Sequence, residues 1–181
     1  GDAFGLITRN AKKAEEIFPD ADEIHQIDLT NQVPKGNIFK DIDVVINLAG
    51  EFVFGFWGWT KSKKASIYDS RVLLTRNLVN GINHSGNNSI SMVSTSAVGY
   101  YIQSGNKKIL DEVSGNGTQF LSKVCFDWEN EAILAQGFGI DVSIVRLGVV
   151  LGRKGGVIST LYWPFILGLG VIFGRGKQWW S

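Results

Sequence analysis

Residues 43–48 read DVVINL, a nearly continuous apolar run. Such a run is typical of a parallel strand that is covered on both faces. Four other segments of the chain also have strand character. They are Phe4–Thr8 and Glu23–Asp28 before the run, and Ser89–Ser96 and Asp141–Leu151 after it.

Helical patterns separate these strands. A short helix is expected over about Asn10–Phe18, with its first residue as the cap. A long amphipathic helix is expected over about Lys61–Asn83, because apolar residues recur there near helical spacing. The other expected helices are Thr118–Gln136, capped by Thr118 and ended by the glycines of Gly137–Gly139, and Val157–Leu167, with a candidate break at Pro164.

The alternation of strands and helices predicts a doubly wound parallel α/β sheet. Such sheets bind ligands at the carboxyl ends of their strands. A dinucleotide-binding sheet should begin with a strand, a Gly-rich turn and a helix. No G-x-G-x-x-G or G-x-x-G-x-x-G follows a strand in this sequence. Either the fold is a different one, or a first strand and its turn lie outside this chain.

Composition bounds the classes of function. The 181 residues fit one domain, or one domain and part of a second, and 44% of them are apolar, which is enough for a core. The net charge of +1 gives no electrostatic case for binding nucleic acid or an anionic membrane. The single cysteine excludes an internal disulfide framework and a cysteine-rich zinc site.

Location is expected to be cytoplasmic. The chain shows no targeting segment at its start. Its longest apolar run, Leu161–Phe173, is shorter than the ~20 residues that a membrane span needs. We therefore expect no membrane partner.

Several short motifs at the predicted strand ends occur in a fixed order. They are Gly1–Asn10 (GDAFGLITRN), Asn47–Glu51 (NLAGE), Ser70–Val72 (SRV), Val93–Tyr101 (VSTSAVGYY), Arg146–Gly152 (RLGVVLG), Pro164–Phe165, Gly168–Gly170 and Gly174–Trp179 (GRGKQW). Together they resemble the nucleoside-diphosphate-sugar epimerase family. That family is an atypical branch of the extended short-chain dehydrogenase/reductases, and some of its members carry a cell-division-inhibitor label.

The resemblance implies a division of the chain. Residues 1–151 would form an NAD(P)-binding Rossmann-like domain that lacks its first strand and its G-x-x-G-x-x-G turn. Residues 152–181 would begin a substrate-side region. Without the first strand the sheet would have a central hole, so we expect this fragment to be poorly stable and to bind a dinucleotide weakly.

Most residues expected to bind the cofactor lie at the ends of the predicted strands. In the resembled family the strand that ends here at Thr8-Arg9 meets the adenosine ribose, where an acidic residue favours NAD and an arginine favours the 2′-phosphate of NADP. A hydroxyl and a guanidinium suit a phosphate, so we expect NADP rather than NAD; the alternative is a solvated arginine at a helix start. Asp28 would lie near the adenine, unless it is a loop aspartate that caps a helix. The expected cofactor-binding residues are Thr8, Arg9, Asp28, Leu29, Leu48, Ala49, Gly50, Arg71, Gly148 and Val149.

The catalytic side departs from the ordinary pattern. Ordinary members of the superfamily use a serine together with Tyr-x-x-x-Lys, in which the tyrosinate is the general base. Ser96 matches the serine position, but Leu121 falls at the tyrosine position and Cys125 at the lysine position. Arg71 stands where relatives often have asparagine. The acid–base chemistry therefore needs another group.

Three side chains are candidates for that group. Cys125 could act only if a cation such as Arg71 lowers its pKa from about 8.5; the alternative is a packed helical thiol. Tyr100 and Tyr101 could replace the missing acid or could pack in the core. The expected catalytic residues are Ser96, Tyr100 and Cys125.

The sequence thus predicts an NADP-binding oxidoreductase or epimerase. A hydride would pass between nicotinamide and a small substrate, and the family label indicates a nucleotide sugar. A non-catalytic NADP(H) sensor and a protein-interaction role stay open because Tyr-x-x-x-Lys is absent. The expected partner is a small molecule, and a homodimer stays open.

Overall fold

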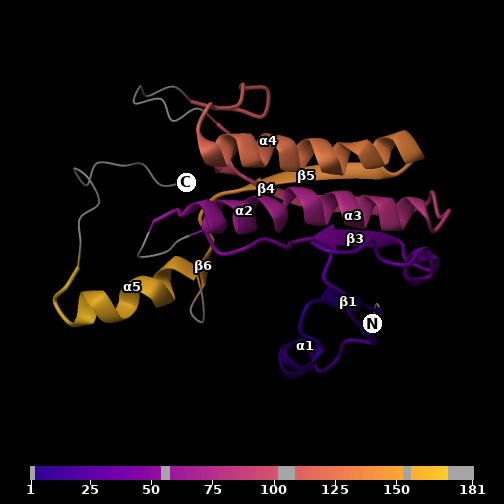
Figure 1. The fold of residues 1–181 in the computed structure, drawn as a ribbon, viewed down its shortest axis with the longest axis horizontal. Helices are drawn as coiled ribbons and strands as arrows, with labels where there is room; N and C mark the ends of the chain where they lie inside the picture. Colours follow the sequence, from indigo (N-terminus) through magenta and orange to yellow (C-terminus); the bar gives the residue numbers. More distant parts are fainter. Residues whose placement is uncertain (1–2, 54–57, 102–108, 153–155, 171–181) are drawn as a thin grey trace.

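A computed structural model describes residues 3–53, 58–101, 109–152 and 156–170. Within them strands and helices alternate, and a layer of helices lies against a sheet (Figure 1). Every ladder between the paired strands is parallel. The predicted parallel α/β class is therefore confirmed.

The paired strands form two separate sheets. β1 (Gly5–Thr8) pairs with β2 (Glu23–Gln26). β3 (Val44–Asn47), β4 (Ser91–Ala97) and β5 (Asp141–Leu147) pair in that order. Among the described residues no ladder joins β1 to β3, so the expected break in the sheet is present.

Helices fill the connections between the strands. Those described are α1 (Ala11–Ile17), α2 (Lys61–Asp69), α3 (Val72–Asn83), α4 (Phe120–Ile133) and α5 (Gly156–Ile166), with 3-10 turns at Gly36–Phe39, Val98–Tyr100 and Leu134–Phe138 and a short strand β6 (Leu151–Gly152). α1 begins as predicted, because Asn10 Oδ1 accepts a hydrogen bond from Lys13 N at 3.0 Å. Gly139 ends the turn after α4 with a left-handed φ of 82°, as the sequence indicates.

The hydrophobic core lies between the helices and one face of the sheets. α3 and α4 run side by side over β3, β4 and β5 (Figure 1). Ile82, Ile90 and Met92 are at most 1% exposed and lie at its centre. The β1–β2 sheet joins this core through Ile7 and Ile27.

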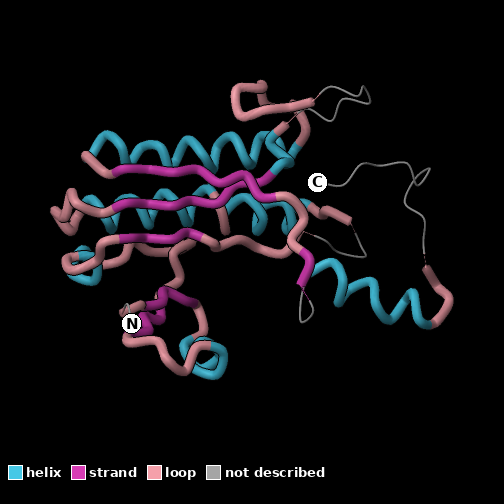
Figure 2. The backbone as a smooth tube through the Cα atoms, turned by 180° about the vertical axis from the view of Figure 1, so that it is seen from behind, coloured by secondary structure: helices cyan, strands magenta, loops and turns pink. Residues whose placement is uncertain are grey.

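The opposite face of β3, β4 and β5 carries no helix among the residues that the structure describes (Figure 2). Val44 and Ile46 of β3 are 52% and 61% exposed, and Val145 of β5 is 40% exposed. The prediction that residues 43–48 are covered on both faces is therefore wrong for this chain. The reason is that α2, α3 and α4 all lie on the other face.

The long helix predicted over residues 61–83 is two helices. α2 ends at Asp69 and α3 starts at Val72, with a break at Ser70 and Arg71. Ser70 Oγ donates to Ile67 O at 3.2 Å and accepts from Glu51 N at 2.9 Å. A serine that bonds the helix backbone in this way favours a helix end. The break thus ties the helix pair to the segment that follows β3.

Three other boundaries differ from prediction. Thr118 does not cap α4, because Gln119 is the N-cap residue and Gly117 N is bonded to Tyr100 O at 2.8 Å. The strand predicted over Asp141–Leu151 stops at Leu147, and β6 follows separately. α5 runs through Pro164 without a break, since Leu167 N still donates to Trp163 O at 3.0 Å.

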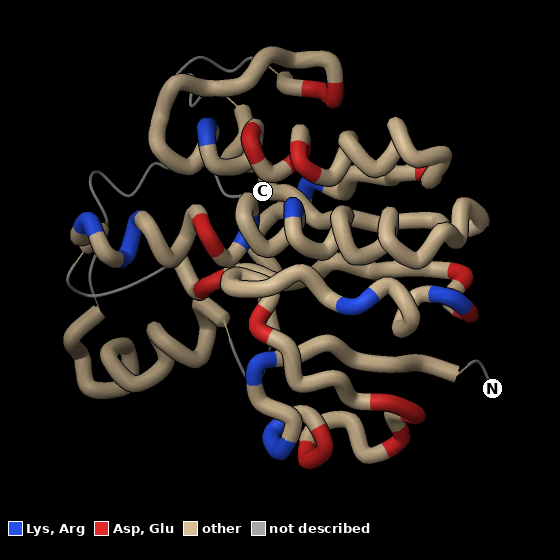
Figure 3. Tube along the Cα trace, turned by 45° about the vertical axis from the view of Figure 1, so that its right-hand side comes forward, with Lys and Arg blue, Asp and Glu red and all other residues tan. Residues whose placement is uncertain are grey.

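Charged residues of both signs are interspersed over the elements (Figure 3). This agrees with the balanced composition of the chain. None of the described helices is long and apolar enough to cross a membrane. The GRGKQW motif and all of residues 171–181 of the expected substrate-side region fall outside the described residues.

Candidate cofactor and catalytic site

The carboxyl ends of the parallel strands bring the predicted cofactor positions together. Thr8-Arg9 follows β1, Leu48–Gly50 follows β3, and Gly148 and Val149 follow β5 in exposed positions. Leu29 differs, because its side chain is 7% exposed and belongs to the hydrophobic core. The positions that follow β1, β3 and β5 lie at the carboxyl ends of strands, where open α/β sheets hold ligands, whereas Arg71 lies at the break between α2 and α3.

Arg9 is exposed and acts on carboxylates from two strand ends. The pKa of Asp28 is lowered first by the hydrogen bond from Thr30, and the charge of Arg9 adds to this. The pKa of Glu51 is lowered first by the hydrogen bond from Lys63, and Arg9 again contributes. The ends of β1, β2 and β3 therefore share one electrostatic environment around Arg9.

Asp28 lies in a local turn. Its Oδ1 accepts hydrogen bonds from Thr30 N at 3.0 Å and from Thr30 Oγ1 at 2.7 Å, and its Oδ2 accepts from Asn31 Nδ2 at 2.7 Å. Both oxygens of this carboxylate already have protein donors. Asp28 therefore closes a local turn, and it is not the N-cap residue of any helix with a described cap, so the helix-capping alternative is wrong.

The Asp28 turn gives a pH-dependent prediction. Because the pKa of Asp28 is lowered in the folded chain, its bonds stabilise the fold above the unfolded pKa near 3.8 and are lost as the pH falls through the lower, folded value. We expect Thr30→Val to raise the Asp28 pKa toward its ordinary value, as measured by a carboxyl NMR titration. Thr30→Ser keeps the hydroxyl and should leave the titration unchanged; a Thr30→Val titration equal to wild type would contradict the prediction.

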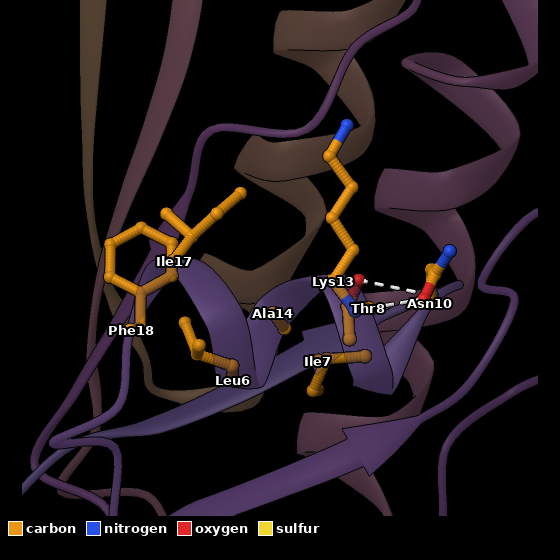
Figure 4. Close-up of a pocket in the computed structure, with 8 residues that line it drawn as sticks. All are labelled: Leu6, Ile7, Thr8, Asn10, Lys13, Ala14, Ile17 and Phe18. Carbon is orange, nitrogen blue, oxygen red and sulfur yellow. Dashed lines mark hydrogen bonds between the residues drawn. The ribbon is translucent and has the colours of Figure 1, made fainter.

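An open pocket of about 320 Å³ lies between β1 and α1 (Figure 4). Its lining is Leu6, Ile7, Thr8, Asn10, Lys13, Ala14, Ile17 and Phe18. Thr8 Oγ1 accepts from Asn10 N at 3.2 Å, and Asn10 Oδ1 caps α1. The pocket adjoins the predicted adenosine side, but two of its polar groups already serve the turn between β1 and α1.

Hydrogen bonds to α3 and α4 hold the end of β3 in place. Asn47, which is 3% exposed, donates from Nδ2 to Thr75 Oγ1 of α3 at 2.8 Å. Its Oδ1 accepts from Ala49 N at 3.3 Å. The Thr75 hydroxyl also accepts from Trp128 Nε1 of α4 at 2.9 Å. The backbone at the end of β3 is thus tied to both covering helices.

Arg71 fills the space beside this strand end. Its Nη2 donates to Glu51 O at 3.0 Å, and its Nη1 donates to Ile67 O at 3.2 Å. A Cβ on Gly50 would lie 2.9 Å from Arg71 Nη2, so glycine lets the backbone lie against the cation. Burial lowers the pKa of Arg71. None of the salt bridges among the described residues uses this guanidinium.

Ser96 lies at the end of β4 in a buried ionic cluster. It is 3% exposed, and its Oγ donates to Glu129 Oε1 of α4 at 2.5 Å. Arg146 of β5 donates to the same carboxylate from Nε, to Oε1 at 2.9 Å, and from Nη2, to Oε2 at 2.8 Å. The bonds to Glu129 raise the pKa of Arg146. One carboxylate therefore links two strands to the helix that covers them.

Both candidate tyrosines contact Arg146. Arg146 Nη1 lies 3.0 Å from the Tyr101 hydroxyl oxygen and donates to it. The Arg146 Cζ lies 3.6 Å from the centre of the Tyr100 ring, within cation–π range. The two rings meet edge to face with their centres 5.5 Å apart. Tyr100 and Tyr101 are half-buried and lie beside the cluster rather than in the hydrophobic core.

Cys125 lies next to the same cluster and is 5% exposed. Burial raises the pKa of its thiol, against the hydrogen bonds with Ala97 and Ser96, and Glu129 adds to the rise. Arg71 acts in the lowering direction, as expected from the sequence, but its effect is the smallest of these. The thiol is therefore protonated at neutral pH in this structure.

Glu129 and Arg146 are the polar members that sequence reasoning missed as site residues. A signal was present for each: Arg146 is a charge within an otherwise uncharged stretch of β5, and Glu129 follows Cys125 by four residues on α4. Residues four apart share a helix face. Among the residues described, no group of three or more His, Cys, Asp or Glu side chains is placed to hold a metal ion.

Comparison with known proteins shows the family to which the chain is similar. The pattern of the NAD dependent epimerase/dehydratase family matches residues 3–181. The epimerase family protein SDR39U1 homolog, chloroplastic, of Arabidopsis thaliana is 34% identical over 181 residues, which are 99% of this chain and 51% of that protein. The chain thus spans about half the length of this curated relative.

The fold of the chain is also similar to those of solved structures. The nucleoside-diphosphate sugar epimerase of Corynebacterium glutamicum is 30% identical with a TM-score of 0.72, over 100% of this chain and 41% of that one. The structure of the human epimerase family protein SDR39U1 with NADPH is 24% identical in sequence and has a TM-score of 0.68. The match covers 97% of this chain and 64% of that one. The UDP-glucuronic acid 4-epimerase of Bacillus cereus with UDP-glucuronic acid and NAD is 19% identical and has a TM-score of 0.71, over 92% of this chain and 54% of that one. Because these last two structures are only 24% and 19% identical to the chain, their likeness shows the fold alone. With its parallel α/β fold and the family pattern over nearly all its length, the chain belongs to the NAD dependent epimerase/dehydratase family.

Proposed function

We propose that the full protein binds NADP and moves a hydride between the nicotinamide and a carbon of a small substrate. The observation that carries the cofactor choice is the exposed Arg9 at the end of β1, directly after the Thr8 hydroxyl. An acidic residue at this place would favour NAD, whereas a guanidinium complements the 2′-phosphate of NADP. The human relative solved with NADPH supports this choice, and the Bacillus cereus enzyme solved with NAD supports the alternative.

The residues present at the strand ends fit a dinucleotide. Ala49 and Gly50 leave the backbone bare where it turns away from β3. Arg71 supplies a half-buried positive charge beside that backbone and has no carboxylate bonded to it among the described residues. Gly148 and Val149 would line the neighbouring end of β5, and Asp28 would flank the adenine. When bound, NADP would supply the hydride donor or acceptor.

The substrate side would be formed by the ionic cluster. Ser96 would orient a substrate oxygen, and Tyr100 and Cys125 would lie against it. A nucleotide sugar is the substrate class we propose, in line with the solved relatives. A cytoplasmic location and a homodimer are part of the same proposal.

The cofactor proposal is tested by titrating the full-length protein with NADPH and with NADH while its tryptophan fluorescence is recorded. We expect tight NADPH binding and weak NADH binding. Arg9→Ala should weaken NADPH about tenfold or more, because a charged hydrogen bond contributes about 1.5–3 kcal/mol, and should leave NADH unchanged. Lys12→Ala, an exposed cation on α1, is the matched control. Equal losses for both dinucleotides, or no loss, would contradict the role of Arg9.

A second candidate function is an NADP(H) sensor without chemistry. It is favoured by Leu121 and Cys125, which stand where a tyrosine and a lysine are expected. Such a protein would bind NADPH but would never exchange its hydride. Transfer of deuterium from labelled NADPH to any member of a nucleotide-sugar panel would exclude the sensor.

A further inference from the structure

Glu129 is a buried carboxylate with two partners, a charged guanidinium and a neutral hydroxyl. Its side chain is 8% exposed. Arg146 donates to it twice and fixes both oxygens. Ser96 donates to Oε1 through its hydroxyl. The arginine fixes the position of the carboxylate, and the serine links it to the end of β4.

The direction of the Ser96 hydroxyl limits what this residue can offer to a ligand. A serine hydroxyl has one donor hydrogen and two acceptor lone pairs. At 2.5 Å from a carboxylate oxygen, the hydrogen of Ser96 is committed to Glu129. The Cys125 thiol also hydrogen-bonds with Ser96 and takes a second position of the hydroxyl, so one acceptor lone pair of Ser96 Oγ is left for a ligand. In this state Ser96 recognises a group that carries a hydrogen, such as an alcohol, rather than a bare carbonyl oxygen.

We propose that Ser96 and Glu129 form a two-step proton relay in which Glu129 is the final acceptor. The proposal rests on the proposed hydride-transfer function. As the hydride leaves the carbinol carbon of a bound secondary alcohol for oxidised NADP, the alcohol proton passes to Ser96 Oγ. The proton already on Ser96 passes to Glu129 Oε1. The products are a ketone, reduced NADP and a neutral carboxylic acid, so one hydride and one proton are accounted for.

The surrounding groups suit this relay. Arg146 Nη2 keeps hold of Oε2, so the carboxylate stays in place when Oε1 receives the proton. Arg146 Nη1 donates to the Tyr101 hydroxyl and to Glu112 O, the latter at 3.1 Å, which anchors the guanidinium independently of Glu129. In the opposite direction, neutral Glu129 would return its proton to Ser96, which would then donate to a carbonyl. Glu129 acts through Ser96 and is a positioning residue in the resting site.

The single cysteine provides a readout that needs no substrate. A final proton acceptor must be ionised in the resting protein, and the charges of Glu129 and Arg71 act on the pKa of the buried Cys125 thiol in opposite directions. The thiol is titrated through thiolate absorbance in the full-length protein, with Cys125→Ser as the blank. We expect Glu129→Gln to lower the Cys125 pKa by about one unit, because a neighbouring negative charge is removed. Glu131→Gln, on the same helix and paired with Arg76, is the matched control and should leave it unchanged.

A second readout separates the relay from a merely structural ion pair. Cyclohexanol and cyclohexanone have the same carbon skeleton, but only the alcohol donates a hydrogen bond. Ligand-observed NMR on the full-length protein should show several-fold stronger binding of cyclohexanol, and Glu129→Gln should remove this preference. An unchanged Cys125 pKa in Glu129→Gln would overturn the proposal, and so would equal binding of the two probes to wild type. If the protein instead failed to bind NADPH, the proposed function would fail, while these two readouts would still report on Ser96 and Glu129.

Discussion

Arg146→Ala is expected to lower the free energy of unfolding by about 3–5 kcal/mol, because it leaves a buried carboxylate without its charged partner. Glu129 is 8% exposed and the Arg146 side chain 17% exposed, so water compensates little for the lost bonds. The alanine also removes the cation that lies over Tyr100 and donates to Tyr101. Urea unfolding followed by circular dichroism measures the change.

Arg76 offers a matched control for this substitution. Arg76 of α3 bonds Glu131 of α4, the helix that carries Glu129, through Nε at 3.1 Å and Nη2 at 2.6 Å, but the Arg76 side chain is 51% exposed. The Glu131 side chain is 13% exposed, so this pair is exposed on the arginine side only, and Arg76→Ala should cost less than Arg146→Ala. Similar losses for the two alanine variants would show that burial does not decide the strength of these pairs.

Thr75→Val is expected to destabilise the fold by about 2–4 kcal/mol, although the two side chains have nearly the same shape. Its hydroxyl oxygen accepts from Asn47 Nδ2 and from Trp128 Nε1, and the residue is fully buried. Valine would leave the indole N–H with no acceptor and the Nδ2 group of Asn47 with only the longer contact to Ser94 Oγ at 3.4 Å. Chemical unfolding measures the loss.

Thr75→Ser separates the hydroxyl from the methyl group in this test. The serine keeps the acceptor oxygen and removes one methyl, which costs about 0.5–1.5 kcal/mol in a packed core. We therefore expect the serine variant to be clearly more stable than the valine variant. The reverse order would mean that packing of the methyl group, rather than the two hydrogen bonds, holds the end of β3.

Much of the fold could be predicted because it depends on local signals. The Asn10 cap, the glycine at 139 and the apolar runs each report on their own neighbourhood, and the structure confirms them. The break between α2 and α3 was not predictable in the same way. It depends on Glu51, whose backbone bonds Ser70 and Arg71 from 19 and 20 residues away.

In the candidate site too, the features that depend on local sequence could be predicted, and those that depend on contacts between distant residues could not. The strand ends that carry Thr8, Arg9 and Gly50 follow from the alternating pattern, because parallel strands end at a common edge. The link between Ser96, Glu129 and Arg146 joins three elements separated by 17 to 33 residues, and only packing brings them together. The pattern of apolar residues could not predict that one face of β3 is exposed. A continuous apolar run has the same sequence pattern whether or not a second layer of helices covers it.

The division of the strands into two sheets bears on how the molecule opens. No ladder hydrogen bond joins β1 to β3, so the segment β1–α1–β2 can separate without breaking any bond within β3, β4 and β5. Its hold on the remainder depends on apolar contacts of Ile7, Ile27 and Leu29 and on the bond from Asn77 to Leu29 O at 2.8 Å. Amide protons of this segment should therefore exchange through a local, low-energy opening, while those of β4 and β5 wait for global unfolding. Arg9, which we propose to select the cofactor, thus lies in the segment that we expect to open first.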